Sequence, residues 1–281
     1  NPLNFINEQT NTDRANVILS NAAFVYNPIP ELTIRISGGI ENRDDRTDNY
    51  QTRNFFNSPG VASVSTSQFT SLLSENTINY NKTFADRHQL DALIGFTYQD
   101  FTTTFLAANG VGFLSDSFGS SNLGAAETPG IPSSGYAKSV LLSYLGRINY
   151  SFDNKLLLTA SFRADGSSRY SPGNKWGFFP SGAIAWRISE EGFLRDNSAL
   201  SDLKLRASWG KTGNQAISPY ATLNRLFPGN TVFGNELFTT LSPSTTLPGN
   251  LRWETTEQYN FGLDFGLLNN RVFLTADYYI K

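Results

Sequence analysis

The chain has 281 residues, of which 39% are hydrophobic, 14% aromatic and 16% charged, and its net charge is −2. An average soluble domain carries about 25% charged residues, and a nearly neutral chain has no basic surface to attract nucleic acid. Cysteine is absent and His88 is the single histidine. This composition excludes disulfides, thiolate sites and multi-histidine zinc sites, and we expect no metal and no other cofactor.

No run of about 18 apolar residues occurs, so no helix is expected to cross a membrane. The opening residues, NPLNFINEQTNTDR, do not resemble a signal peptide. Alternating apolar and polar residues instead predict strands almost throughout. The expected strands are, in chain order, residues 16–27, 31–41, 69–80, 88–105, 136–152, 155–166, 175–188, 202–212, 252–266 and 271–281.

The connections between these strands fall into two alternating kinds. The short ones are residues 28–30, 81–87, 153–154 and 267–270, with a medium connection at 189–201. The long ones, rich in Gly, Ser, Asn and Thr, are residues 42–68, 106–135, 167–174 and 213–251. Successive connections of an up-and-down antiparallel sheet lie at opposite ends, so all short turns should share one end. That asymmetry is typical of outer-membrane barrels and less so of soluble sandwiches.

The expected strands have one apolar and one polar face, and two hairpins show which positions pair. A tight turn at Asp153 should pair Tyr150 with Leu158, and Asn149 with Thr159 on the other face. The expected pairs of the last hairpin are Tyr259 with Tyr278, Phe261 with Ala276, Leu263 with Leu274, and Phe265 with Val272.

Two structures fit this alternation: a soluble sheet with its apolar side inside, or a barrel with its apolar side in lipid and its polar side on a lumen. Strands of 11 or more residues exceed the usual length and match the roughly 9 to 11 residues that cross a bilayer. Aromatic residues near strand ends favour an interfacial girdle; they are Tyr150, Trp186, Trp209, Tyr259 and Tyr278. The prediction is an all-β, antiparallel, up-and-down transmembrane β-barrel, to which this chain contributes about ten strands.

Several polar side chains are expected to face the lumen of such a barrel. They are Arg147, Asn149, Thr159, Arg163, Asp165, Arg187, Lys204, Arg206, Asp264 and Asp277. In the segment 162–179, Arg163, Asp165 and Arg169 could pair in a turn-forming corner, or could contact a plug or substrate. Asp44, Asp45 and Asp48 could offer oxygens to a cation, although a solvated acidic loop is the plainer interpretation.

Three segments resemble a known family. They are YLGRINYSFDNKLLLTASFRADGSSRYSPGNKWGFFPSGAIAWRISEE (144–191), LSDLKLRASWGKTGNQAISPYAT (200–222) and LRWETTEQYNFGLDFGLLNNRVFLTADYYIK (251–281). In that order they resemble the barrel of SusC/RagA-type TonB-dependent outer-membrane transporters of Bacteroidetes. Such proteins have a plug domain and a barrel of about twenty-two strands, so the resemblance implies that residues 1–281 are an internal fragment, a partial barrel of about ten strands without the plug domain.

The resemblance also implies function. The family imports oligosaccharides or oligopeptides across the outer membrane of Gram-negative bacteria, beneath a SusD-like lipoprotein, with energy delivered by TonB through a plug and TonB box that this chain does not show. No enzymatic activity is expected. The alternatives are a soluble all-β glycan-binding or adhesin module and an outer-membrane hydrolase dependent on His88.

Substrate contacts are expected in the long loops, because sugars stack on aromatic rings. The candidates are Tyr220, Phe227, Phe233 and Phe238 in the segment 213–251, and Phe113 and Phe118 in 106–135. Loop packing or docking of the lipoprotein would explain the same residues.

Overall fold

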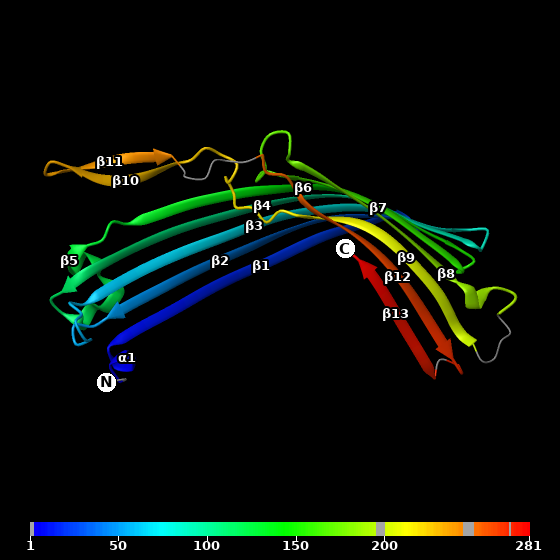
Figure 1. Cartoon of the computed structure of the whole chain (residues 1–281), viewed down its shortest axis with the longest axis horizontal. Helices are drawn as coiled ribbons and strands as arrows, with labels where there is room; N and C mark the ends of the chain where they lie inside the picture. The colour runs from blue at the N-terminus through cyan, green and yellow to red at the C-terminus, as the bar shows by residue number, and fades with distance from the viewer. Residues whose placement is uncertain (1–2, 195–199, 244–249, 270) are drawn as a thin grey trace. The chain divides into compact units, whose positions relative to one another are not determined.

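The computed structural model describes residues 3–194, 200–243, 250–269 and 271–281, and nearly all of its regular structure is strand (Figure 1). The strands are β1 (Gln9–Ile29), β2 (Leu32–Gln51), β3 (Val61–Phe84), β4 (His88–Phe113), β5 (Ala126–Pro129), β6 (Ser133–Phe152), β7 (Leu156–Ser167), β8 (Trp176–Arg187), β9 (Leu200–Asn214), β10 (Leu226–Phe233), β11 (Glu236–Pro243), β12 (Glu254–Leu267) and β13 (Val272–Ile280). The helical elements are α1 (Leu3–Asn7), η1 (Asp116–Ser121), η2 (Leu123–Ala125) and η3 (Ile188–Glu190). None of the helices in the described part of the chain is long and apolar enough to cross a membrane.

The strands form one main sheet and one separate hairpin. The hydrogen-bonded order of the main sheet is β1-β2-β3-β4-β6-β7-β8-β9-β12-β13, with the short β5 paired to β4, and β10 and β11 form a two-stranded sheet. Successive strands of the path are neighbours, so the predicted up-and-down antiparallel topology is confirmed. All ten expected strands are present.

The chain divides into two compact units, which are described separately. Unit 1 comprises Asn1–Ala22, Gly38–Leu73 and Gln99–Ser139, and unit 2 comprises Ala23–Ser37, Ser74–Tyr98 and Val140–Lys281. In unit 2, β12 lies between β9 and β13, as Figure 1 shows.

The short turns share one end of unit 2. The backbone N–H of Asp153 donates to the carbonyl of Arg87, and the N–H of Arg187 donates to the carbonyl of Lys155, both at 2.8 Å. The Arg87 guanidinium also pairs with the Asp153 carboxylate. Asp153 and Asn154 both have positive φ, which suits a tight hairpin turn between the paired Phe152 and Leu156. The predicted common end is therefore confirmed for these turns.

Three expectations about strand bounds were wrong. Residues expected as loop at 42–68 belong largely to β2 and β3, and β4 continues to Phe113. The segment 213–251, expected as an irregular loop, contains the β10–β11 hairpin. In 42–68 the alternation is mostly between polar residues of different kinds, so the apolar signal that marks a strand was weak there, whereas in 213–251 Pro228, Gly229 and Gly234 obscured it.

The register of the hairpin between β6 and β7 is as predicted, with Tyr150 opposite Leu158 and Asn149 opposite Thr159. The register of the last hairpin was wrong by two residues, because Leu267 pairs with Val272 and Phe261 pairs with Tyr278. Four residues separate Leu267 from Val272, whereas six would separate the predicted pair of Phe265 and Val272. A shift of two residues keeps every side chain on its predicted face, so the face assignment of this hairpin was unaffected.

Burial is opposite to that of a soluble domain. In the described part of the chain, the buried hydrophobic residues are Tyr50, Ala62, Phe113, Ala164, Tyr170 and Phe179, and the buried polar residues are Asp48, Ser71, Asp100, Ser139, Ser143, Ser151, Asp165 and Ser167. The accessible surface is 18669 Å², whereas a compact protein of this mass exposes about 12,000 Å². The sheet thus buries little apolar area by itself.

Candidate functional site

The apolar face of unit 2 is exposed. Ile148 is 52% exposed, Ile94 61% and Ile184 47%, and these residues belong to β6, β4 and β8. A soluble sheet would have covered such a face, because burying a large aliphatic side chain stabilises a fold by about 1.5–3 kcal/mol. An exposed contiguous apolar surface indicates contact with lipid or with another protein.

Aromatic side chains on this apolar face have their polar atoms bound near the turns. The Trp186 indole N–H donates to Glu191 Oε1 at 3.1 Å, and Tyr150 Oη lies 2.7 Å from His88 Nδ1. His88 also contacts the Phe152 ring, with centroids 5.0 Å apart. Side chains with an apolar body and a polar tip are suited to a boundary between lipid and water. His88 thus has a packing role beside Tyr150.

The other side of the sheet, here called the polar face of unit 2, carries a hydrogen-bonded row across neighbouring strands. Asn149 pairs with Thr159, and Ser208 with Asn260. The Thr159 hydroxyl donates to Asn149 Oδ1 at 2.9 Å, and the Asn149 amide donates to Asp91 Oδ1 at 3.1 Å. The amide of Asn260 donates to Ser208 Oγ at 3.2 Å. Sequence reasoning had identified Asn149 and Thr159 but missed Asp91.

Arg206 is the centre of a three-residue ion-pair group on this face. Its guanidinium donates two hydrogen bonds to Asp264, at 2.9 and 3.0 Å, and lies 3.0 Å from Asp277 Oδ1. Gly262 pairs with Arg206 on one side and with Asp277 on the other. A Cβ at Gly262 would lie 2.6 Å from both Arg206 Cζ and Asp277 Oδ1. The glycine therefore leaves the space in which the guanidinium reaches both carboxylates.

The remaining predicted residues of the polar face are distributed along it. Arg187 is opposite Lys204, which is opposite Asp264, so three of them share one rung. Arg147 approaches Asp91 at 3.9 Å. The candidates thus form several local groups, at the rung of Arg187, around Arg206 and along the row of Asn149.

The polar corner at 162–179 is only partly as expected. Arg163 does pair with Asp165, at 2.7 Å, and its guanidinium donates to Ser143 Oγ at 3.1 Å. Arg169 Nη1 donates to the carbonyls of Gln215 and Ile217, and the expected pairing of Arg169 with Arg163 and Asp165 stays a prediction. That contact joins the β7–β8 loop to the segment after β9, and no local sequence pattern predicted it.

An aromatic cluster fixes the same corner. Tyr170 is 2% exposed and its hydroxyl donates to the carbonyl of Asn214 at 3.1 Å. The Trp253 ring packs against Tyr170 and Phe179, with centroids 5.0 and 5.4 Å apart. A Cβ at Gly213 would collide with the Phe179 ring. The β7–β8 loop is therefore packed against the strands that flank it.

The β10–β11 hairpin brings three of the four substrate-loop candidates together. Phe227 and Phe233 are six residues apart on β10, an even number, and Phe238 is opposite Thr231 between them, so the three rings share one face of the hairpin. All three are exposed, and the Arg225 guanidinium lies 5.0 Å from the centre of the Phe227 ring. Tyr220 lies outside the hairpin, in a turn with positive φ.

The opposite face of this hairpin is aliphatic. It carries Leu226, Val232, Leu237 and Leu241, each at least 60% exposed. A two-stranded hairpin is marginally stable alone in water, and here both faces present apolar area. The signal that could have found it is the alternation of Val232, Leu237 and Leu241 with polar neighbours, which was obscured by Pro228, Gly229 and Gly234.

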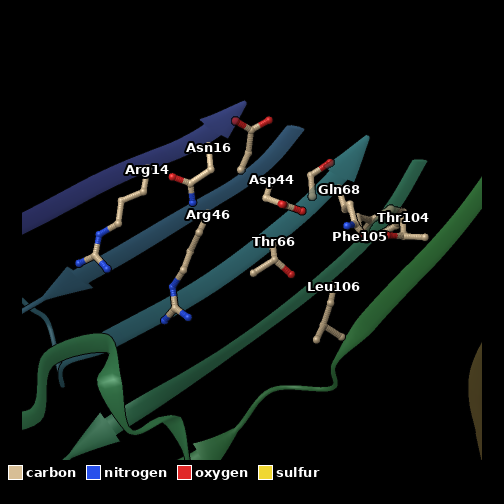
Figure 2. Close-up of a pocket in the computed structure, with 11 residues that line it drawn as sticks. Arg14, Asn16, Asp44, Arg46, Thr66, Gln68, Thr104, Phe105 and Leu106 are labelled. Carbon is tan, nitrogen blue, oxygen red and sulfur yellow. The ribbon is translucent and has the colours of Figure 1, made fainter. Parts of the chain in front are cut away.

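Unit 1 contains a groove of about 540 Å³, here called the unit 1 groove (Figure 2). It is lined by Arg14, Asn16, Asp44, Asp45, Arg46, Thr66, Ser67, Gln68, Thr104, Phe105 and Leu106. These residues come from β1, β2, β3 and β4.

The acidic segment beside this groove is not the solvated loop that the sequence suggested, because it is part of β2. Arg43 pairs with Asp45 at 2.8 Å and Arg46 with Asp48 at 2.9 Å. No group of three or more potential metal ligands occurs in the described part of the chain. Arginine pairing thus accounts for two of the three aspartates.

At the loop end of unit 1, Asp116 is held by two partners. The Tyr50 hydroxyl donates to it at 2.7 Å and Arg53 Nε at 3.2 Å. The Tyr50 hydrogen bond, with further contributions from Arg53, lowers the pKa of the Asp116 carboxyl. Tyr50 also packs edge-on against Phe113, with centroids 5.7 Å apart, so Phe113 is a core residue rather than an exposed substrate contact. Phe118 is 56% exposed.

An antiparallel up-and-down sheet with an exposed apolar face and a hydrogen-bonded polar face defines the wall of a β-barrel membrane protein. The chain matches the family described as TonB dependent receptor-like, beta-barrel, over residues 2–281. It therefore belongs to that family.

The chain is similar to named receptors and to a solved structure. It is 36% identical to TonB-dependent receptor P26 of Formosa agariphila, over 100% of this chain and 29% of that protein. It is 45% identical to TonB-dependent receptor SusC of Bacteroides thetaiotaomicron, over 51% of this chain and 15% of that protein. A structure titled the RagAB peptide transporter superimposes with a TM-score of 0.90 at 28% identity, over 98% of this chain and 31% of that chain. The chain spans less than a third of the length of these proteins.

Proposed function

We propose that this chain forms part of the barrel wall of a SusC/RagA-like, TonB-dependent transporter in the outer membrane of a Gram-negative bacterium. The observation that carries the proposal is the inverted sheet of unit 2, in which Ile148 is 52% exposed while Asp165 is 8% exposed. Lipid satisfies an exposed apolar face, whereas water or a plug satisfies a polar one. The family membership and the likeness to SusC and RagAB support the same conclusion.

Accessibility of single cysteines tests this arrangement, since the chain has no native cysteine. The protein is expressed at its native length, and Arg147→Cys, Thr159→Cys and Asp264→Cys should react with a polar maleimide from the lumen. Cysteines that replace Ile148, Leu158 or Leu263 should be shielded by lipid. The reverse order of labelling would contradict the proposal.

The matched positions are close in the structure, which makes the comparison sharp. Leu158 and Thr159 are adjacent in β7, and Leu263 and Asp264 are adjacent in β12. The two cysteine variants of each pair therefore differ mainly in the face of the sheet on which the cysteine lies. Faster labelling at Thr159 than at Leu158, and at Asp264 than at Leu263, is the expected result. Equal labelling within both pairs would indicate a sheet that is wet on both faces, which contradicts an apolar face in lipid.

For substrate, we propose oligosaccharide or oligopeptide, contacted by the aromatic face of the β10–β11 hairpin. Phe227, Phe233 and Phe238 share that face with the hydroxyls of Thr231 and Thr240. Rings beside hydroxyl groups suit both a sugar ring and a peptide side chain. The transporter would cooperate with a SusD-like lipoprotein, and TonB would supply energy.

Uptake assays distinguish this face from the aliphatic one. Substituting Phe227 and Phe238 by alanine should raise the substrate concentration that gives half-maximal uptake by about thirtyfold, because aromatic contacts of this kind contribute about 1 kcal/mol each, or about 2 kcal/mol together. Leu237→Ala and Leu241→Ala on the opposite face serve as matched controls. Equal losses from both pairs would show that the hairpin acts through its folding or docking and not through substrate contact.

A further inference from the structure

The unit 1 groove lies on a face of the sheet that is apolar a few residues away. Thr70 Oγ1 on β3 donates to Asn42 Oδ1 on β2 at 2.9 Å, which aligns the two strands. Ile40 lies two residues from Asn42 and Leu72 two residues from Thr70, so both are on the same face as these residues; they are 40% and 47% exposed. In the other direction the same face carries Asp44 and the other even-numbered groove residues. Within unit 1, one face thus changes from apolar to polar along the strands.

The distance between the two zones matches a membrane boundary. Arg46 is six residues from Ile40 along β2, which corresponds to about 20 Å of strand and less along the normal of a bilayer because barrel strands tilt. The lipid headgroups begin where the hydrocarbon ends, so a groove at this distance meets headgroups rather than acyl chains.

The groove contains two neighbouring arginines with unequal compensation. The Thr47 hydroxyl donates to Asp13 Oδ1 at 2.6 Å, which places Arg46 beside Arg14 across β1 and β2. Figure 2 shows both guanidinium groups extending in the same direction. Arg46 has Asp48 as its partner at 2.9 Å, whereas Arg14 acts on Asp48 only through its charge and forms no ion pair within 4.0 Å with any residue that the structure describes. Like charges on adjacent strands repel, and an anion between them would relieve the repulsion.

The rest of the groove is rich in groups that bind hydroxyls. Asn16, Gln68 and Thr104 offer amide or hydroxyl groups, and the Asp44 carboxylate accepts a hydrogen bond from the Asn42 amide at 2.8 Å. A carboxylate has room for further donors. A ligand that combines an anion with sugar hydroxyls would use both parts of this lining.

We propose that the unit 1 groove binds the phosphorylated sugar headgroup of a glycolipid in the surrounding membrane, with a phosphate held between Arg14 and Arg46. The planar guanidinium fork suits bidentate binding of phosphate oxygens. The exposed Ile40 and Leu72 on the same face favour a lipid over a carboxylate of a soluble partner protein, because they offer a place for the acyl chains. The proposal rests on the membrane location proposed above.

The test uses the protein at its native length in detergent, titrated with a bisphosphorylated diglucosamine glycolipid and with the same glycolipid after removal of its phosphates. Native mass spectrometry counts bound lipid. The wild-type protein should bind the phosphorylated form at least tenfold more tightly, and Arg14→Gln should reduce that preference about tenfold. Arg43→Gln is the matched control, because Arg43 lies on the opposite face of the same strand and pairs with Asp45.

A second variant should act in the opposite direction. Asp48→Asn removes the partner of Arg46 and frees its guanidinium, so binding of the phosphorylated glycolipid should tighten about threefold; a general loss of folding would instead weaken binding. Equal binding of the two glycolipids, or equal loss from Arg43→Gln and Arg14→Gln, would overturn the proposal. So would loss of lipoprotein assembly from Arg14→Gln with unchanged lipid binding, which would assign the groove to a protein partner.

The cysteine labelling of Leu158 and Thr159 is measured on the same preparation. If labelling fails its expected order, the membrane location falls; if it succeeds while lipid binding fails, only the groove assignment falls.

Discussion

The Gly262→Ala substitution tests whether the Arg206 ion-pair group contributes to the stability of the barrel wall. The new Cβ would lie 2.6 Å from Arg206 Cζ and from Asp277 Oδ1, so the guanidinium must move. The movement itself costs little, because these atoms are at the ends of flexible side chains. The cost comes from the hydrogen bonds that are lost to Asp264, whose side chain is only 14% exposed.

The magnitude follows from these contacts. A hydrogen bond to a charged group contributes about 1.5–3 kcal/mol, and the 34% exposure of Arg206 reduces that figure through solvent screening. Loss of the Asp264 bonds should therefore cost about 1–2 kcal/mol. Replacing glycine by alanine lowers the entropy of the unfolded chain and returns about 0.5 kcal/mol. The net expectation is a decrease of about 1 kcal/mol in the free energy of unfolding.

Urea unfolding of the protein in lipid vesicles, followed by tryptophan fluorescence, measures this change. Gly146→Ala is the matched control, because no atom lies within 4 Å of a Cβ built there, and its effect should be neutral or slightly stabilising. The decisive comparison is Gly262→Ala in an Arg206→Ala background, where the loss should vanish. An unchanged loss in that background would refute the argument, since the cost would then come from the backbone and not from the guanidinium.

Two further predictions concern the ends of the strands. Hydrogen bonding by Arg87 lowers the pKa of the Asp153 carboxyl below its ordinary 3.8. The pair therefore stabilises the turn above that pH, and this contribution is lost as the pH falls through the lowered pKa. Arg87→Gln should reduce the loss of stability between pH 4 and more acidic values, and an unchanged pH profile would exclude the pair as its cause. At the opposite end, Tyr170→Ala should leave a cavity against Trp253 and destabilise the corner by about 3 kcal/mol, seen as faster proteolysis of the β7–β8 loop; protection equal to that of Tyr170→Phe would show that the ring does not fix the loop.

A soluble module would require the apolar face of unit 2 to be covered by other residues. A sandwich needs a second layer over Ile94, Ile148 and Ile184, and none of the described residues supplies one, since each is about half exposed or more. The barrel interpretation would lose its physical basis if Ile148, Leu158 and Trp186 converged on a dry centre. They do not, because Leu158 and Trp186 are 37% and 40% exposed. The exposed face and the family membership agree.

The sequence by itself determined the class of fold, the up-and-down order and which residues share a face, because the period of two along a strand is a local property of the backbone. It also determined the β6–β7 register, in which the Asp153 turn leaves one arrangement that matches apolar to apolar. It did not determine where the strands end, because residues such as those of β2 near Asp44 lack an apolar face and carry no alternation in hydropathy.

Only the tertiary structure decided which polar residues meet. Arg206 reaches Asp264 and Asp277 from a different strand, over the space left by Gly262, and Arg169 bonds to carbonyls beyond β9. These contacts join positions far apart in the chain, and their partners depend on register and on the length of each connection. The hydropathy of a strand shows which of its sides prefers water. Which residues on that side contact one another depends on the positions of neighbouring strands, which the sequence of a single strand does not determine.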